Sequence, residues 1–123
     1  MDITRAGARQ SRQATPDYFT GRVWQDTIVE APEPARMRAR RVTIEPGART
    51  PWHTQPLGQT LQGQAPQVIR PGDTVWIPPG EEHWHGAGPD TMMSHLAMQE
   101  AQDGRAADWL EQVDEADYLA APG

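Results

Sequence analysis

The sequence contains neither cysteine nor lysine among its 123 residues. The missing thiol excludes disulfides, thiolate nucleophiles and zinc–thiolate sites, and the missing lysine amine excludes Schiff-base chemistry. Any chemistry must therefore come from histidine, carboxylate or hydroxyl groups, or from a bound metal ion. The lack of cysteine is also compatible with a reducing cytoplasm, where we expect the protein to reside.

Long apolar runs and an excess of positive charge are lacking as well. No stretch is long enough to span a membrane, and the first residues contain no apolar run of the kind found in signal peptides. The net charge of −6 argues against a nucleic-acid surface, because binding phosphates requires a basic field. A chain of this length forms one domain with one core. The sequence therefore favours a compact, one-site domain that binds neither membrane nor nucleic acid.

Most of the chain alternates short segments rich in β-branched and aromatic residues with turns that contain glycine and proline, a pattern typical of an all-β domain. The segment Ala106–Val113 instead has apolar residues at helical spacing and predicts a short amphipathic helix. The predicted strands are Gly21–Val29, Arg38–Glu45, Thr50–Gln55, one that starts at Gln59–Leu61, Thr74–Ile77, His83–Gly86 and Met92–Glu100.

Residues 1–16 are polar, small and rich in arginine, with few apolar side chains to bury. We interpret them as an arm that is disordered unless it pairs with the sheet of a partner chain, and residues 17–123 as a single domain. Exchange of such an arm between protomers predicts a homodimer or a higher homo-oligomer.

The four histidines lie on segments that the predicted strands direct toward one point. His83 and His85 are two residues apart, so they project to the same face of an extended backbone, as do His53 and Gln55. His95 lies on the last predicted strand. Histidine has only an intermediate preference for burial, so a metal-type site explains this convergence better than core filling, with a purely structural cluster as the alternative.

Two stretches around these histidines resemble the two motifs of the cupins, G-x5-H-x-H-x3-E and G-x5-P-x-G-x2-H. The first motif is matched at Gly47 and His53, but Gln55 and Gln59 stand where the family has histidine and, in most members, glutamate. The stretches PGARTPWHTQPLGQTL, PGDTVWIPPGEEHWHGA and HLAMQE resemble the single-domain bacterial cupins that include manganese-dependent hydroxynitrile lyases. The similarity runs from about Asp17 to Tyr118, and the second motif is matched at every fixed position, namely Gly72, Pro78, Gly80 and His83.

The resemblance implies a cupin-type jelly-roll β-barrel and a divalent metal ion, manganese first of all, held by His53, Gln55, Gln59 and His83. Neutral imidazole and amide ligands also suit iron, cobalt, nickel or zinc. Gln55 replaces an imidazole with a weaker oxygen donor, so we expect weaker metal binding, and both a working and a degraded site stay open.

The activity that the resemblance implies is the cleavage of a small hydroxylated substrate, a cyanohydrin, with the metal as Lewis acid and a histidine as general base. Histidine ordinarily titrates near neutral pH, and His85 and His95 match no ligand position, so they are candidates for the general base or for residues that hold the metal ligands in place. Gln99 shares a strand face with His95. The alternative function is a non-catalytic or metal-poor cupin that binds a small molecule.

Arg40 shares the face of Val42 and Ile44 on the predicted strand Arg38–Glu45, which directs it into the barrel. An inward arginine is costly unless it meets a carboxylate, a hydrogen-bond network or water. Two interpretations stay open: an anion-binding role, which would favour a carboxylate-bearing substrate over a neutral nitrile, and a side chain that folds back to solvent.

The connection between the two motifs is short. The residues Gln62–Pro66 lead straight into Gln67–Arg70, so the chain lacks about ten residues, the length of one hairpin. Either a tight turn closes a smaller barrel, or the wall stays open and the arm of a partner chain covers its edge. We favour the open wall, because Gln62–Pro66 lacks a hairpin signal and Pro66 cannot donate to a ladder.

Overall fold

The computed structural model describes residues 1–54, 66–102 and 107–120. As predicted, the regular structure in these ranges is almost entirely β, and no helix there is long and apolar enough to cross a membrane. Its elements are β1 (Arg12–Gln13), β2 (Val23–Glu30), β3 (Met37–Ile44), β4 (His53–Thr54), β5 (Met93–Glu100), β6 (Asp108–Trp109) and α1 (Glu115–Tyr118).

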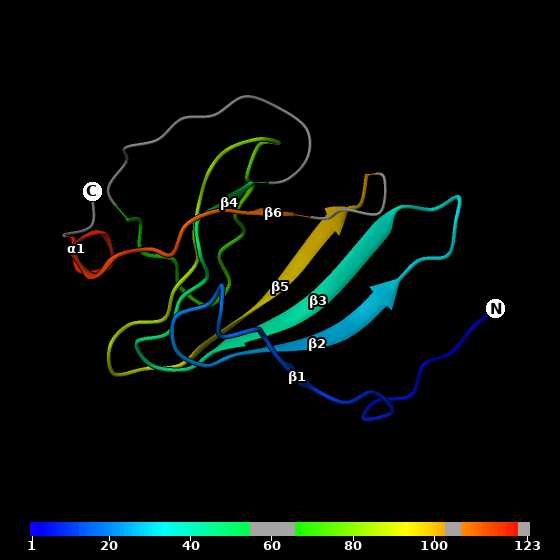
Figure 1. Ribbon diagram of the computed structural model, residues 1–123. Helices are drawn as coiled ribbons and strands as arrows, with labels where there is room; N and C mark the ends of the chain where they lie inside the picture. Colours follow the sequence, from blue (N-terminus) through cyan, green and yellow to red (C-terminus); the bar gives the residue numbers. More distant parts are fainter. Residues whose placement is uncertain (55–65, 103–106, 121–123) are drawn as a thin grey trace.

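The strands form two antiparallel sheets (Figure 1). The larger sheet has the order β1-β2-β3-β5, and β4 pairs with β6 in a smaller sheet. In the larger sheet Ile44 pairs with Val23 on one side and with Met93 on the other. Alternation along β3 buries Val42 and Ile44, which are 8% and 0% exposed. The predicted inward face of this strand is therefore confirmed.

The core lies on this inward face of the larger sheet. Phe19 belongs to the core cluster and meets Trp109 of β6 edge-to-face, with ring centroids 5.2 Å apart. This aromatic contact ties the smaller sheet to the core. The buried members of the cluster are Ala14, Phe19, Val23, Val42, Ile44, Ala48 and Ala87.

Strand β4 is short but is held on both sides. His53 pairs with Trp109 of β6 and forms an isolated bridge with His83. His53 and His83 exchange two backbone hydrogen bonds of 2.9 and 3.0 Å, so the two residues lie directly opposite each other. Thr50 adds a third bond, because its N–H donates to the carbonyl of His85 at 2.9 Å. The backbone thus fixes the histidine-bearing segments side by side.

Each of the two motifs contains a glycine that its turn requires. Gly47 and Gly80 have φ values of 76° and 78°, in the left-handed region where a side chain is strained. After Gly80 the N–H of Glu81 donates to the carbonyl of Pro78 at 3.2 Å and closes the turn that precedes His83. The motif glycines therefore set the direction in which each ligand segment leaves its turn.

The predicted helix at Ala106–Val113 is wrong over the described residues 107–113. This stretch runs as β6 and an extended continuation, in which Trp52 donates to the carbonyl of Glu111 and Leu110 donates to the carbonyl of Trp52. The backbone pairing and the ring contact of Trp109 with Phe19 outweigh the helical spacing of the apolar residues, because local propensity is a weak signal beside tertiary contacts.

The helix starts two residues after that stretch. Asp114 is its N-cap, and the carboxylate of Asp114 accepts a hydrogen bond from the N–H of Asp117 at 2.8 Å. Its last residue, Tyr118, donates its hydroxyl to the carbonyl of Ala87 at 2.7 Å and stacks on the guanidinium of Arg49 at 4.4 Å. The short C-terminal helix is thus anchored to the core by a side chain of its last turn.

Two further strand predictions need correction. Thr74–Ile77 forms no strand, and Val75 and Trp76 are 52% and 82% exposed. A strand exists only beside a neighbour that takes up its backbone groups, and none of the described strands pairs with this segment. His83–Gly86 contributes isolated bridges to His53 and Arg49 in place of a continuous strand. The predicted strands over Gly21–Val29, Arg38–Glu45 and Met92–Glu100 are confirmed to within two residues at each end.

The N-terminal arm meets the sheet of its own chain. Arg12 and Gln13 form β1 and pair with Gln25 and Trp24 of β2, and Ala14 enters the core at 8% exposure. The observed pairing covers one edge of β2 without a partner chain. The segment Gln62–Pro66, where we predict an open wall, and the strand that starts at Gln59–Leu61 lie outside the described residues, except for Pro66.

Candidate metal centre

The four imidazoles lie in one continuous cluster. The ring centroid of His53 is 4.1 Å from that of His83 and 5.4 Å from that of His85, and the ring centroids of His83 and His85 are 5.0 Å apart. His95 joins from the opposite sheet, with its ring 5.0 Å from that of His85. The predicted convergence is therefore observed, while the chemical role of each ring stays a prediction.

His53 and His83 are held by the same local device. The Nδ1 of His53 donates to the carbonyl of Pro51 at 3.0 Å, and the Nδ1 of His83 donates to the carbonyl of Glu81 at 2.8 Å. In each case the acceptor lies two residues earlier in the chain. These bonds place the proton on Nδ1 and leave the lone pair of Nε2 free, which is the arrangement that a metal-binding histidine requires.

The freed nitrogen of His83 is enclosed. Its Nε2 is buried, and no group of the described residues lies within hydrogen-bonding distance of it. A buried polar nitrogen without a partner costs free energy, which a bound metal ion would offset. Among the described residues, the Nε2 of His83 is thus a hydrogen-bond acceptor without a donor, and His83 occupies the ligand position of the second cupin motif.

His85 completes a group of three. One ring nitrogen each from His53, His83 and His85 lies within 4.8 Å of the others. His53 is the most buried of the three, and the other two are partly buried. This group can hold a metal ion through three nitrogen atoms, the donor type that suits divalent ions of the first transition series.

Burial lowers the pKa of all four imidazoles. Desolvation, followed by repulsion from His83, lowers the pKa of His53 from 6.5 to about 4. Desolvation and the neighbouring histidines hold the pKa of His85 well below 6.5, and desolvation alone lowers that of His95. Desolvation also lowers the pKa of His83, partly opposed by the carbonyl and the charge of Glu81. All four rings are therefore neutral at pH 7, so protons do not compete with a metal ion for their lone pairs.

His95 lies outside the group of three. Successive side chains of β5 point to opposite faces of the sheet. His95 points to the inner face, and its cross-strand partner is Val42 of β3. The Nδ1 of His95 is buried and has no hydrogen-bond partner among the described residues. His95 thus approaches the group from the larger sheet, beside His85.

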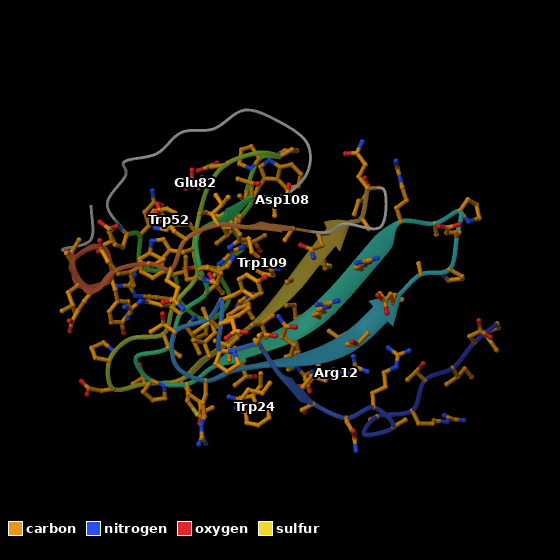
Figure 2. All side chains as sticks on the ribbon, viewed as in Figure 1. Arg12, Trp24, Trp52, Glu82, Asp108 and Trp109 are labelled. Carbon is orange, nitrogen blue, oxygen red and sulfur yellow. The ribbon has the colours of Figure 1, made fainter. Side chains whose placement is uncertain are left out.

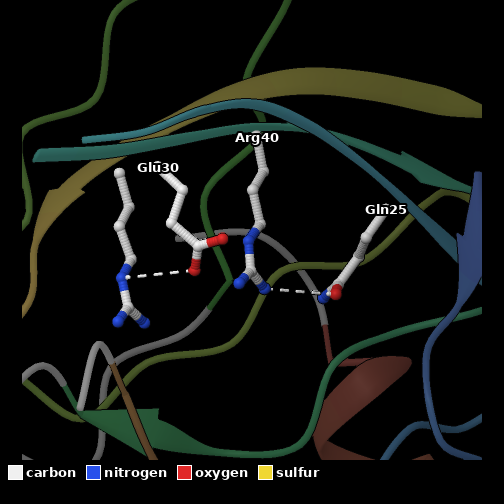
Figure 3. A network of polar contacts seen from close by, with 4 residues as sticks. Gln25, Glu30 and Arg40 are labelled. Atoms are coloured by element: carbon white, nitrogen blue, oxygen red, sulfur yellow. Dashed lines mark hydrogen bonds and ion pairs between the residues drawn. The ribbon is translucent and has the colours of Figure 1, made fainter. Parts of the chain in front are cut away.

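The remaining predicted site residues fall into two sets. Gln55 and Gln59 lie outside the described residues. Gln99 and Arg40 lie on the inner face of the larger sheet, where Gln99 is paired with Arg38 and Arg40 with Ala97. Figure 3 shows Arg40 and Gln25 projecting from the same side of the sheet, and Arg40 donates to the amide oxygen of Gln25 at 3.4 Å.

Two residues of the site are not evident from the sequence. The ring of Trp109 lies 5.0 Å from that of His53, and Figure 2 shows it projecting from β6 toward the larger sheet. The buried hydroxyl of Thr50 accepts the backbone N–H of His85 at 3.0 Å. Trp109 lies at the site only because β6 pairs with β4, and no local sequence pattern predicts that pairing. Thr50 precedes the first-motif histidine by three residues, which is the one signal that could have indicated it.

Comparisons with known proteins agree with this architecture. No family model matches the chain. The chain is 50% identical, over 129 aligned residues, to an (R)-mandelonitrile lyase of Granulicella tundricola, and the match covers 96% of this chain and 98% of the relative. The alignment is longer than the 123 residues of the chain, so the relative contains residues that have no counterpart here.

A solved structure supports the fold. The crystal structure of a cupin-like protein from Thermotoga maritima superposes with a TM-score of 0.78 at 33% identity, covering 96% of this chain and 95% of the other. Together with the two antiparallel sheets, this likeness confirms the predicted shortened jelly roll. The chain therefore belongs to the family of small cupins that includes the (R)-mandelonitrile lyase of Granulicella tundricola.

Proposed function

We propose that this protein is a metal-dependent lyase that cleaves small cyanohydrins of the mandelonitrile type into an aldehyde and cyanide. The observation that carries the proposal is the group formed by His53, His83 and His85, whose ring nitrogens lie within 4.8 Å of one another. The 50% identity to a relative named (R)-mandelonitrile lyase supports the choice of reaction. The fold alone would not identify the reaction, because one fold can host unrelated reactions.

The donor set fits a divalent ion, for which manganese is our first choice. His53 and His83 would bind it through Nε2, since their Nδ1 atoms are bonded to backbone carbonyls. When bound, the ion supplies Lewis acidity toward the hydroxyl oxygen of the substrate. We further propose that Gln55 and Gln59 contribute amide oxygens.

We assign His85 to this set, although its position in the motif is not that of a cupin ligand. The first motif has Gln55 in place of its second histidine, so one imidazole is missing from the family pattern. The ring of His85 lies close enough to His53 and His83 to supply a third nitrogen in its place. A nitrogen donor restores affinity that a carboxamide oxygen alone would not provide.

His95 is our choice for the general base. It is neutral at pH 7 because burial lowers its pKa, and no described hydrogen bond fixes the position of its proton. His95 takes the proton of the substrate hydroxyl, the C–O bond becomes a carbonyl, and the C–CN bond breaks. Cyanide leaves with the electron pair of that bond and takes the proton back from His95 as hydrogen cyanide.

The test compares two neighbours on β5. His95 lies on the inner face, and Leu96 lies on the outer face and is 61% exposed. We expect His95→Ala to lower the rate of benzaldehyde release from mandelonitrile by 10²-fold or more, on the order of a general-base contribution, and Leu96→Ala to leave it unchanged. If both variants cleave mandelonitrile at the wild-type rate, His95 is not the base.

Metal analysis separates this proposal from the alternative of a non-catalytic binding protein. We expect protein purified without added metal, then loaded with Mn²⁺ and desalted, to retain about one ion per chain. Protein that retains no Mn²⁺ and releases no benzaldehyde would favour the binding function.

A further inference from the structure

The side chains on the inner face of the larger sheet change along the strands from apolar to polar and then to cationic. Its rows, read across β2, β3 and β5, begin with the apolar set Val23, Ile44 and Met93. The next row contains Val42 between Gln25 and His95. The two rows after that are centred on Arg40 and on Arg38. The sheet thus presents cationic groups beside the histidine cluster and away from the core.

The two arginines are in different situations. Arg38 forms an ion pair with Glu30 at 3.8 Å. Arg40 is partly buried between Thr27 and Ala97, and its described contact is a hydrogen bond of 3.4 Å to the neutral amide of Gln25. Within residues 1–54, 66–102 and 107–120, no carboxylate lies within ion-pair distance of Arg40. Figure 3 shows the dashed Glu30 contact running to the neighbouring side chain and not to Arg40.

Arg40 is also close to His95, the member of the histidine cluster that lies on the larger sheet. His95 is opposite Val42, so Arg40 is its diagonal neighbour on the same face, and such neighbours are about 7–8 Å apart at the backbone. The side chain of arginine spans that distance. The residue directly opposite Arg40 is Ala97, whose small side chain leaves room beside the guanidinium.

From these contacts we infer that Arg40 is a carboxylate-binding group of the histidine site, and that the site takes small 2-hydroxy acids or cyanohydrins that carry a carboxylate. The inference rests on the proposed function for the position of the substrate. The guanidinium of Arg40 is partly buried, and its described hydrogen bond to Gln25 occupies one of its N–H donors, so further donors can bind a ligand carboxylate. The planar fork of the guanidinium matches the two oxygens of a carboxylate, whereas a neutral nitrile offers it no charge.

The chain provides a matched control for this inference. Arg41 follows Arg40 on β3 but is exposed on the outer face, where it pairs with Asp26 and Leu96. Arg40→Met and Arg41→Met therefore remove the same charge from the two sides of one strand. Arg40→Lys keeps the charge and removes the fork.

The experiment measures the binding of mandelate and of its neutral methyl ester to the manganese-loaded protein by calorimetry. We expect the wild type to bind mandelate at least tenfold more tightly than the ester. Arg40→Met should weaken mandelate binding at least tenfold, Arg40→Lys should weaken it less, and Arg41→Met should not change it. Unchanged mandelate affinity in folded Arg40→Met, or equal affinity for acid and ester in the wild type, would overturn the inference.

Two outcomes separate this inference from the proposed function. Mandelate binding that depends on Arg40, without cleavage of mandelonitrile, would leave the inference standing and remove the lyase. Cleavage of mandelonitrile with no Arg40-dependent binding of mandelate would do the reverse. If Arg40→Met weakened inhibition by cyanide alone, the guanidinium would serve the leaving group, and the carboxylate assignment would be wrong.

Discussion

The buried imidazoles make the stability of the metal-free protein depend on pH, and His53 allows the size of the effect to be worked out. Its pKa falls from 6.5 to about 4 in the folded chain. Between these values the unfolded chain binds a proton that the folded chain does not, so stability is fully present above pH 6.5 and falls as the pH decreases toward 4. The slope is about 1.4 kcal/mol per pH unit for one group.

From pH 7 to pH 5, His53 alone should lower the free energy of unfolding by about 2 kcal/mol. Free carboxylic acids titrate mainly below this window, so they contribute little to it. His85 acts in the same direction, because its pKa is also held well below 6.5. Metal ions bind the neutral rings and should therefore oppose the loss.

Urea unfolding of the metal-free protein, followed by tryptophan fluorescence at intervals between pH 7 and pH 5, measures the effect. We expect His53→Gln to reduce the slope of the unfolding free energy against pH by the amount that one proton contributes. Saturating Mn²⁺ should make the unfolding free energy of the wild type nearly independent of pH. A wild-type stability that is constant over this range, or a His53→Gln variant with the wild-type slope, would refute the idea that His53 is buried in neutral form.

Three further predictions concern the metal set, the arm and the core. Gln55→His should raise both the Mn²⁺ content and the rate of mandelonitrile cleavage, and a gain in metal without a gain in rate would count against the lyase. We propose a homodimer with contacts from the arm, so removal of residues 1–16 should lower the melting temperature and the dimer fraction in sedimentation, whereas an unchanged fraction would limit the arm to its own sheet. Ile44→Ala should cost about 2–5 kcal/mol in urea unfolding, because Ile44 is 0% exposed, and a cost below 1 kcal/mol would mean that the core is wrongly placed.

Residues that act through local backbone geometry were predictable from the sequence. Gly80 and the prolines before it specify the turn that leads to His83, and the two-residue spacing places His83 and His85 together. The alternation along β3 gives the inner face on which Val42 and Ile44 are buried. Each of these features depends on neighbours within a few positions of the chain.

Features that depend on distant pairing were not predictable in the same way. Trp109 lies on a segment with helical spacing, yet the pairing of β6 with β4 makes it a strand residue beside His53. Thr74–Ile77 has the composition of a strand but lacks a described neighbour to pair with. The helix is displaced to Glu115–Tyr118, where Asp114 provides a cap. For Trp109 and for Thr74–Ile77, the presence or absence of a pairing partner far away in the sequence decides the outcome.

The most direct test of the central claim is the metal dependence of mandelonitrile cleavage. The protein is treated with a chelator, desalted, and assayed for benzaldehyde and cyanide before and after Mn²⁺ is added back, in the wild type and in His83→Ala. We expect that cleavage disappears with the chelator, returns with Mn²⁺ in the wild type, and does not return in His83→Ala. Cleavage that persists in the metal-free protein, or that returns equally in His83→Ala, would contradict the account.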